Sequence, residues 1–169
     1  MKHFFLDKIS SPLGALLIVS DGERLCALDY ADYESRMLKL LRARYGQASL
    51  REAKNLGGVS LMLDAYWGGD IARLDSIAIG TGGTPFQQQV WQALRAIPPG
   101  TVMTYGQLAR KLSRPTAYRA VGMTNALNPI AIVVPCHRLV GANGALTGYA
   151  GGLERKRWLL AHEGVVFAQ

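Results

Sequence analysis

The chain is interrupted near its middle by a glycine-rich tetrapeptide, Gly80-Thr81-Gly82-Gly83, at which all hydrophobic periodicity stops. Segments of this composition break both helices and strands. Before the tetrapeptide the sequence is rich in strand patterns, and after it the patterns are helical. We therefore expect the 169 residues to form two domains, one over residues 1–79 and one over residues 80–169.

The first of these parts predicts a small antiparallel β-sheet covered by helix. Short apolar runs separated by Pro, Gly and Asp turn sequences are typical of strands in a meander. The segment 34–45 places Leu, Met and Tyr residues near helical spacing, with Arg and Lys on the other positions. We expect strands over residues 4–9, 15–20 and 24–30, and helices over residues 34–45 and 61–67.

Two capping sequences mark helix starts in the second part. In Thr84-Pro85-Phe86-Gln87, a Thr cap precedes Pro at the first helical position and Gln three residues after the cap, and Thr104-Tyr105-Gly106-Gln107 repeats the pattern. We expect helices over residues 85–97, 107–112, 116–127 and 153–162. The middle two are separated only by the breaker Ser113-Arg114-Pro115, which predicts a helix-turn-helix. The fold class is therefore α+β, with the sheet domain followed by a mainly helical domain.

The charge balance favours a polyanionic partner. Nineteen Lys and Arg against twelve Asp and Glu give a net charge of +7 and a pI of about 9.7, although many basic proteins bind no nucleic acid. No stretch is long and apolar enough for a membrane span or a signal peptide, so we expect a cytoplasmic protein. Cys26 and Cys136 are then expected to be free thiols, and no Cys or His cluster has zinc-site spacing.

The helix expected over residues 116–127 has a composition suited to nucleic acid. Ala117, Ala120 and Gly122 allow its backbone to approach a ligand closely, while Arg119 projects a long cation among them. Further cations expected to contact phosphates are Arg110, Lys111, Arg114, Arg155, Lys156 and Arg157. A solvated basic face is the alternative interpretation. The following Asn128-Pro129 predicts a turn that ties this helix to the next segment.

The tetrapeptide Pro135-Cys136-His137-Arg138 offers a candidate reactive cysteine at the end of the apolar run 130–134, which predicts a buried strand. Apolar surroundings keep a thiol neutral unless a base assists it. Consecutive residues of an extended segment point to opposite faces, so His137 serves Cys136 only if the chain turns after Pro135 or a water bridges them. Glu163 is the carboxylate best placed to orient the histidine. A buried structural thiol and a solvated helix-end charge are the alternatives.

The type of carbon that such a cysteine attacks determines whether the protein can react more than once. Attack on an acyl carbon gives a thioester, which water hydrolyses, as in cysteine proteases. Attack on an alkyl carbon gives a thioether, whose sulfur is not displaced by water. In the second case the protein is consumed, one molecule for each alkyl group.

These residues resemble the O6-alkylguanine-DNA alkyltransferases over nearly the whole second half of the chain. Seven blocks occur in the order and at the separations which that family uses: Thr84-Pro85-Phe86-Gln87, Ile97-Pro98-Pro99-Gly100, Tyr105-Gly106-Gln107-Leu108-Ala109, Arg119-Ala120-Val121-Gly122, Asn128-Pro129, Pro135-Cys136-His137-Arg138 and Gly148-Tyr149-Ala150-Gly151-Gly152. Residues 1–79 match the family's variable amino-terminal domain more loosely, with no counterpart of the metal-binding methyl-acceptor domain of some bacterial relatives.

The resemblance implies roles for these residues. Cys136 is the alkyl acceptor, activated through water by His137 with Glu163 behind it, and Asn128 braces the recognition helix against the active loop. Tyr105 helps to turn out the target nucleotide and donates a proton as guanine leaves, and Arg119 fills the gap left by the flipped base. The helix faces the minor groove. The implied DNA-binding residues are Thr116, Ala117, Arg119, Ala120 and Gly122, and the implied substrate-pocket residues are Arg138, Leu139, Tyr149, Ala150 and Gly151.

The implied function is single-turnover repair of O6-alkylguanine, and of O4-alkylthymine, by a monomer that needs no cofactor, no metal and no obligate protein partner. The runner-up is a relative that binds alkylated DNA without repairing it, but such relatives lack the acceptor cysteine. A turning-over cysteine hydrolase and a transcription regulator are further alternatives. The chain departs from the family pattern at Tyr118 and Met123, where smaller residues are expected, and at Leu139, where Val is commoner.

Overall fold

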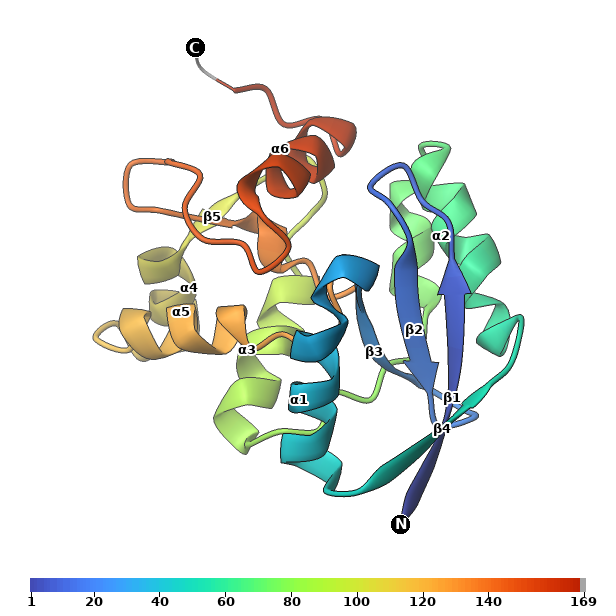
Figure 1. Cartoon of the computed structure of the whole chain (residues 1–169). Helices are drawn as coiled ribbons and strands as arrows, with labels where there is room; N and C mark the ends of the chain where they lie inside the picture. Colours follow the sequence, from blue (N-terminus) through green and yellow to red (C-terminus); the bar gives the residue numbers. More distant parts are fainter. Residues whose placement is uncertain (168–169) are drawn as a thin grey trace. The chain divides into compact units, whose positions relative to one another are not determined.

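The computed structural model describes residues 1–167, which form two compact units (Figure 1). The first unit contains Met1–Gly82 together with a short later segment, Pro129–Val133. The second contains Gly83–Asn128 and the chain from Val134 onward. The candidate site residues named above all belong to the second unit. None of the helices in residues 1–167 is both long and apolar enough to cross a lipid bilayer.

The first unit is built on a four-stranded sheet in the order β3-β2-β1-β4. Its strands are β1 (Lys2–Ile9), β2 (Leu16–Ser20), β3 (Leu25–Tyr30) and β4 (Ala48–Glu52). The first three pair antiparallel, as predicted, but β4 pairs parallel to β1, with Lys2 opposite Ala48 and Leu6 opposite Glu52. The prediction of a purely antiparallel sheet is therefore wrong. The sequence Ala-Ser-Leu-Arg-Glu of β4 is half-buried to exposed, so it lacks the apolar pattern that marks the other strands.

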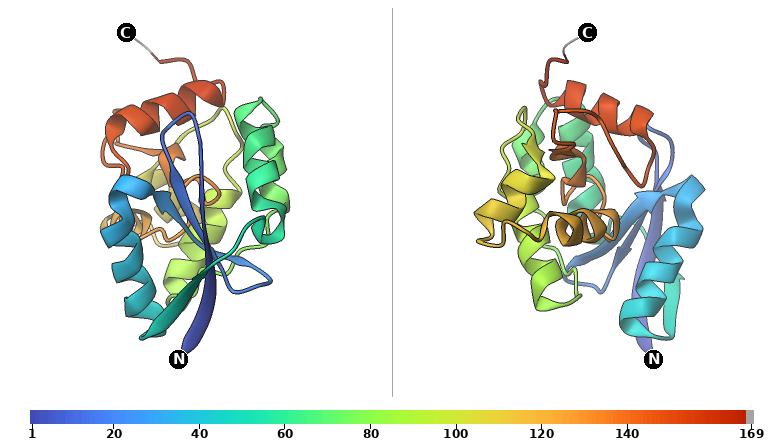
Figure 2. Two further views of the ribbon diagram at one scale, coloured as in Figure 1. Left: turned by 45° about the vertical axis from the view of Figure 1, so that its right-hand side comes forward. Right: turned by 90° about the vertical axis from the view of Figure 1, so that its left-hand side faces the viewer.

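Helix α1 (Glu34–Tyr45), predicted with these bounds, covers one face of this sheet. Met37 and Leu41 of the helix pack with residues of three strands: Phe4, Leu17, Val19, Cys26 and Ala27. Helix α2 (Val59–Trp67) lies on the other side of the sheet from α1 (Figure 2). Short 3-10 helices complete the unit at Ala31–Tyr33, Leu56–Gly58 and Ile71–Ser76.

The apolar run 130–134 is not a strand, which corrects the prediction. Only Ile130 forms a bridge, parallel to Leu28 on the open edge of β3, and Ile79 bridges Leu25 on the same edge. The chain then reverses at Ile132, whose φ is 73°, while the Val133 N–H donates to the Ala131 carbonyl at 2.8 Å. This is a γ-turn of the strained class, in a residue that is 1% exposed. The apolar composition of residues 130–134 correctly predicts that they are buried. Five buried residues can, however, form a packed turn as well as a strand.

The second unit contains the helices α3 (Pro85–Arg95), α4 (Tyr105–Lys111), α5 (Tyr118–Ala126) and α6 (Leu153–His162). Both capping boxes are confirmed: the Gln87 N–H donates to Thr84 Oγ1 and the Gln107 N–H to Thr104 Oγ1, each at 3.1 Å. The paired short strands β5 (Met103–Thr104) and β6 (Leu139–Val140) run parallel. Helix α6 has the predicted bounds.

Helices α4 and α5 pack against each other and are joined by residues 112–117 (Figure 1). Because Thr104 caps α4, that helix begins two residues earlier than predicted, at Tyr105. Helix α5 begins two residues later than predicted, because Arg114 to Ala117 form a turn in which the Ala117 N–H donates to the Arg114 carbonyl. Thr116 and Ala117 therefore precede α5 instead of forming its first turn.

Candidate active site

Cys136 begins a 3-10 turn, Cys136–Arg138, at the point where the buried backbone reverses. Pro135 has φ −80° and ψ 66°, and the Cys136 N–H donates to the Val134 carbonyl at 2.8 Å, which is an inverse γ-turn. The turn that the Cys136 and His137 pair requires is therefore present directly after Pro135. Cys136 itself is 4% exposed and forms no disulfide.

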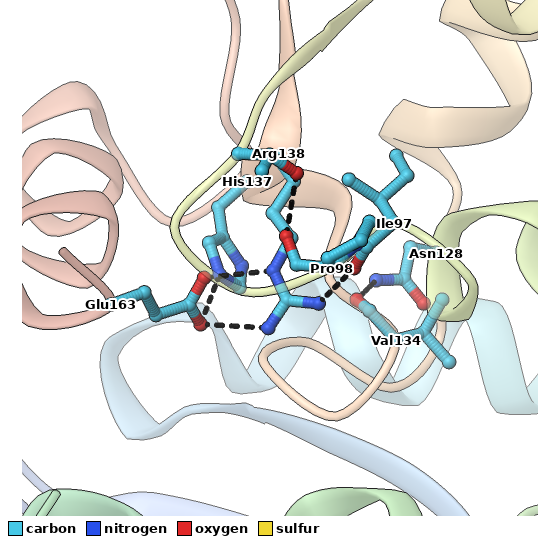
Figure 3. A network of polar contacts seen from close by, with 8 residues as sticks. Ile97, Pro98, Asn128, Val134, His137, Arg138 and Glu163 are labelled. Carbon is cyan, nitrogen blue, oxygen red and sulfur yellow. Dashed lines mark hydrogen bonds and ion pairs between the residues drawn. The ribbon is translucent and has the colours of Figure 1, made fainter. Parts of the chain in front are cut away.

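Two side-chain amides, one in the last turn of α5 and one just after the helix, hold this turn. Asn128 Nδ2 donates to the Val134 carbonyl at 2.8 Å (Figure 3). Asn125 Nδ2 donates to the carbonyl of Cys136 at 3.3 Å. The two amides thus grip the backbone on either side of Pro135. Sequence reasoning singled out Asn128 but missed Asn125, whose position one helical turn earlier was the available signal.

His137 lies with Glu163 and Arg138 in a buried polar network (Figure 3). His137 Nε2 is 2.9 Å from Glu163 Oε2. Arg138 donates from Nε to Glu163 Oε1 at 2.7 Å and from Nη2 to Oε2 at 3.1 Å, and its Nη1 donates to the Ile97 carbonyl at 2.7 Å. The Arg138 side chain therefore forms a bidentate, buried ion pair with the Glu163 carboxylate.

This network fixes the protonation of His137. Burial alone would raise the pKa of Glu163, but His137 and Arg138 hold it at about 2. Burial lowers the pKa of His137, against the opposing effect of Glu163, so the imidazole is neutral at neutral pH. A neutral ring facing a carboxylate through Nε2 carries its proton there. Nδ1, which is buried and has no hydrogen-bond partner within residues 1–167, is then the basic nitrogen.

Tyr105, the first residue of α4, reaches from the capping box toward the loop before α6. Its hydroxyl donates to the Thr147 carbonyl at 3.4 Å, and burial raises its pKa, so the phenol keeps its proton. A Cβ on Gly122 of α5 would lie 3.7 Å from the Tyr105 ring, which is an ordinary van der Waals contact. The Tyr105 ring therefore lies beside Gly122 of α5.

Lys156 is a site residue that the sequence analysis misassigned. It was expected to contact phosphates from the surface of α6, but it is 0% exposed, so that expectation is wrong. Its ammonium donates to the carbonyls of Leu139 at 2.6 Å, Thr147 at 2.8 Å and Gly148 at 3.2 Å. Burial lowers its pKa to about 8. The next residue, Arg157, is exposed, because consecutive residues of an α-helix face different sides. Lys156 therefore binds backbone carbonyls inside the protein, whereas Arg157 stays at the surface.

The expected pocket residues lie along the two segments that Lys156 joins. Leu139 is buried and pairs with Met103 in the β5–β6 ladder. The Tyr149 ring stands edge-on to His137, with centroids 6.5 Å apart. Ala150 is half-buried, and the buried Gly151 accepts a hydrogen bond on its carbonyl from Arg155 at 3.3 Å.

The residues expected to bind DNA are gathered on and just before α5. Arg119 and Ala120 are exposed, Gly122 is half-buried, and Thr116 is exposed in the preceding turn, beside the half-buried Ala117. Tyr118, at which the chain departs from the family pattern, is also exposed and therefore lies on the surface of α5 and not in the core. Helix α5 also carries Asn125, which donates to the carbonyl of Cys136, so this helix joins the expected DNA-binding face to the cysteine turn.

Comparison with known proteins gives the same two-part division. Residues 85–165 match the family model of the 6-O-methylguanine DNA methyltransferase DNA binding domain, and residues 5–77 match that of the ribonuclease-like domain of the same methyltransferases. The chain is 55% identical to the methylated-DNA–protein-cysteine methyltransferase of Salmonella typhimurium, over 97% of this chain and 98% of that protein. It is 42% identical to the protein of the same name from Methanosarcina acetivorans, over 91% and 94% of the two chains.

A similar solved structure is that of Mycobacterium tuberculosis OGT in complex with DNA. Its TM-score is 0.80 at 38% sequence identity, with 96% of this chain and 92% of that chain covered. An O6-methylguanine-DNA methyltransferase from Pyrococcus kodakaraensis has a TM-score of 0.71 at 28% identity, covering 96% and 99%. The similarity therefore extends over both units.

Proposed function

Because the chain belongs to the 6-O-methylguanine DNA methyltransferase family, we propose that it repairs DNA by moving an alkyl group from O6 of guanine to its own Cys136. The observation that carries the assignment to these residues is the ordered set Glu163, His137 and Cys136. Glu163 fixes the tautomer of a neutral histidine, and the histidine follows the cysteine directly within a tight turn. This is the arrangement of a base-assisted nucleophile.

The chemistry follows from the protonation states. The thiol gives its proton to Nδ1 of His137 through a bridging water, and the sulfur attacks the alkyl carbon on O6. The sulfur–carbon bond forms as the carbon–oxygen bond breaks, and guanine leaves with the electron pair. Tyr105, whose pKa is raised by burial, supplies a proton to the departing base and regains one from the imidazolium through solvent. Overall, the thiol proton ends on guanine and the alkyl group on sulfur.

The product accounts for a single turnover. A thioether sulfur is not a leaving group toward water, and the structure describes no second cysteine in the unit that contains Cys136. Each protein molecule is therefore used once. O4-alkylthymine presents the same alkyl–oxygen bond on a smaller ring, and we include it among the substrates.

The proposed partner is duplex DNA containing an alkylated base. The pair α4 and α5 acts as a helix-turn-helix whose second helix enters the minor groove, with contacts from Thr116, Ala117, Ala120 and Gly122. Flipping is required because a thiol that is 4% exposed cannot reach O6 inside a base stack. Arg119 fills the vacated space. Arg138, Leu139, Tyr149, Ala150 and Gly151 form or support the pocket that receives the base.

Residues 80–169 form the catalytic and DNA-binding domain in this proposal, and residues 1–79 support it. We expect the protein to act as a monomer, without cofactor, in the cytoplasm. Asn128 braces the recognition helix against the turn that holds the nucleophile, through the hydrogen bond to Val134.

The test is the intact mass of the protein after incubation with excess duplex DNA carrying one O6-methylguanine, followed by peptide mapping. We expect one added methyl group, located on Cys136, and repair that stops at one equivalent. The Cys136→Ala variant should bind the damaged duplex and acquire no methyl group. An unmodified wild-type protein that retains the damaged duplex would instead identify a lesion-binding protein. More than one equivalent of repaired base per protein would identify a hydrolytic enzyme.

A further inference from the structure

Helix α5 carries two large side chains on its exposed side that the proposed mechanism does not use. Tyr118 is 48% exposed and Met123 is 69% exposed. The buried side of the same helix is formed by Val121, Thr124 and Asn125. The two large residues thus lie outside the buried core side of α5.

Helical geometry places these side chains at two edges of the exposed side of α5. Five residues along an α-helix correspond to roughly 7.5 Å of rise and about 140° of rotation. Gly122, Ala126 and Arg119 lie between Tyr118 and Met123 around the helix, at about 40°, about 80° and about 100° from Tyr118. Tyr118 and Met123 therefore stand at the two edges of an exposed strip that carries two small residues and the long Arg119 side chain, and they are roughly 7.5 Å apart along the helix axis.

The charge around this face selects a polyanion as its occupant. Residues 105–126 contain four cations, Arg110, Lys111, Arg114 and Arg119, and no Asp or Glu. The Arg119 guanidinium lies 5.9 Å from the centroid of the Tyr118 ring. An aromatic ring paired with a guanidinium suits contact with a nucleobase, which has both a π-face and polar edges.

Gly122 connects this face of α5 to the site. It lies beside the ring of Tyr105, the residue assigned above to the departing base. Tyr118, Arg119 and Met123 all lie within four residues of Gly122, which is about one helical turn. DNA that rests on this face therefore brings its base steps next to Tyr105.

We propose that Tyr118 and Met123 are wedge residues, which enter the minor groove on either side of Gly122 and open the base steps that flank the flipped nucleotide. This inference rests on the proposed function and extends it to two residues at which the chain departs from the family pattern. Apolar side chains at such positions partly unstack neighbouring bases and stabilise a distorted duplex. The expected consequence is slower return of the flipped nucleotide, and hence faster repair in duplex DNA.

The experiment compares alkyl-transfer rates on three substrates: duplex DNA with one O6-methylguanine, the same strand unpaired, and free O6-benzylguanine. Tyr118→Ala should lower the duplex rate about five- to tenfold, as expected for loss of one base–aromatic contact, with a smaller loss on the single strand and little on the free base. Met123→Ala should act in the same direction but more weakly. Tyr118→Phe, which keeps the ring, and Met123→Leu, which keeps the volume, should restore the duplex rate.

A second readout detects unstacking directly. The fluorescence of 2-aminopurine placed next to the lesion should rise on binding of the wild-type protein and rise less with Tyr118→Ala. The slope of log affinity against log salt should stay unchanged in Tyr118→Ala, because no charge is lost, whereas Arg110→Ala should reduce it by about one. Leu61→Ala, on α2, is the matched control for removal of an exposed apolar side chain.

The outcomes separate this inference from the proposed function. If wild-type protein is methylated on Cys136 but Tyr118→Ala and Met123→Ala repair duplex DNA at the wild-type rate, the wedge is refuted and the repair function stands. Equal losses on all three substrates would place these residues in the fold or in the chemistry instead. A change in oligomeric state without a change in duplex repair would make this face a contact between copies of the chain. If wild-type protein gains no methyl group, the proposed function itself fails.

Discussion

Lys156 Nζ donates a hydrogen bond to the backbone carbonyl of Leu139 at 2.6 Å, in a place with no exposure to solvent. The same ammonium donates to Thr147 and Gly148. One side chain of α6 therefore joins the strand after the Cys136 turn to the loop that carries Tyr149. Burial of an ammonium without hydrogen-bond partners has a high free-energy cost, and the three accepting carbonyls offset that cost for Lys156.

Lys156→Met keeps the aliphatic length but leaves these carbonyls without their donor. We expect the unfolding free energy to fall by roughly 1–3 kcal/mol, and alkyl transfer to slow on duplex DNA and on free O6-benzylguanine alike, because the pocket wall loosens for both. Urea unfolding and transfer kinetics measure the two effects. Arg157→Met, on the exposed side of α6, is the control and should leave the free-base rate unchanged. Wild-type rates in Lys156→Met would show that the pocket holds its shape without the ammonium.

The lowered pKa of Lys156 gives a pH signature. Burial lowers its pKa to about 8 in the folded protein from the ordinary 10.5, so between these values the unfolded chain binds more protons. The unfolding free energy should therefore gain a contribution as pH rises from 8 to 10.5, and that contribution is lost again as pH falls from 10.5 to 8. Denaturation curves across this window should show the difference between wild type and Lys156→Met. Parallel pH profiles for the two proteins would contradict the prediction.

Glu163→Gln removes the charge that Arg138 and His137 share. In the wild type, His137 and Arg138 lower the pKa of Glu163 from 4.5 to about 2, so its stabilising contribution is present above pH 4.5 and is lost as pH falls toward 2. The variant should lack this acid-dependent loss. At neutral pH it should be less stable by about 3–5 kcal/mol, because the Arg138 guanidinium stays buried without its partner. Acid and urea titrations check both points, and equal slopes between pH 4.5 and 2 would count against the assignment.

The Asn125→Ala variant tests the hydrogen bond from Asn125 to the Cys136 carbonyl. Asn125 also buries an Oδ1 atom that has no hydrogen-bond partner within the described chain, so its removal relieves one polar burial while losing one hydrogen bond. We expect a small change in unfolding free energy but about a tenfold slower transfer to Cys136 on both substrates. Asn128→Ala, which loses the shorter bond to Val134, provides the comparison. A large stability loss with an unchanged rate per folded molecule would assign Asn125 to the fold alone.

Arg119→Ala should slow repair in duplex DNA more than reaction with free O6-benzylguanine. The side chain is exposed on α5, and it is needed only when a base has left the stack. Parallel rate measurements on the two substrates give the answer. Equal losses on both would remove Arg119 from base flipping, while Arg119→Lys separates the requirement for charge from that for the planar group.

Local sequence signals predicted the helices well where the backbone itself carries the information. Thr84 and Thr104, each with Gln three residues later, marked two capping boxes correctly, since these boxes satisfy donors that no tertiary contact needs to supply. The helix after Thr84 begins at the predicted residue, whereas the helix after Thr104 begins two residues before the predicted one. The amphipathic patterns of α1 and α6 gave their full bounds. Strand β4 was not predicted, because its residues are too polar and exposed to show the alternating apolar pattern of a strand. They form a strand only through their pairing with β1.

The sequence alone determined the chemistry available to this protein: a thiol next to an imidazole, a carboxylate near the chain's last helix, and a basic helix pair with small residues. Tertiary structure decided which groups meet. It turned the apolar run after Pro129 into buried turns, joined Arg138 as well as His137 to Glu163, and drew Lys156 inward while Arg157 stayed outside. Side-chain types are local properties, whereas burial and the pairing of distant polar groups depend on how the whole chain packs.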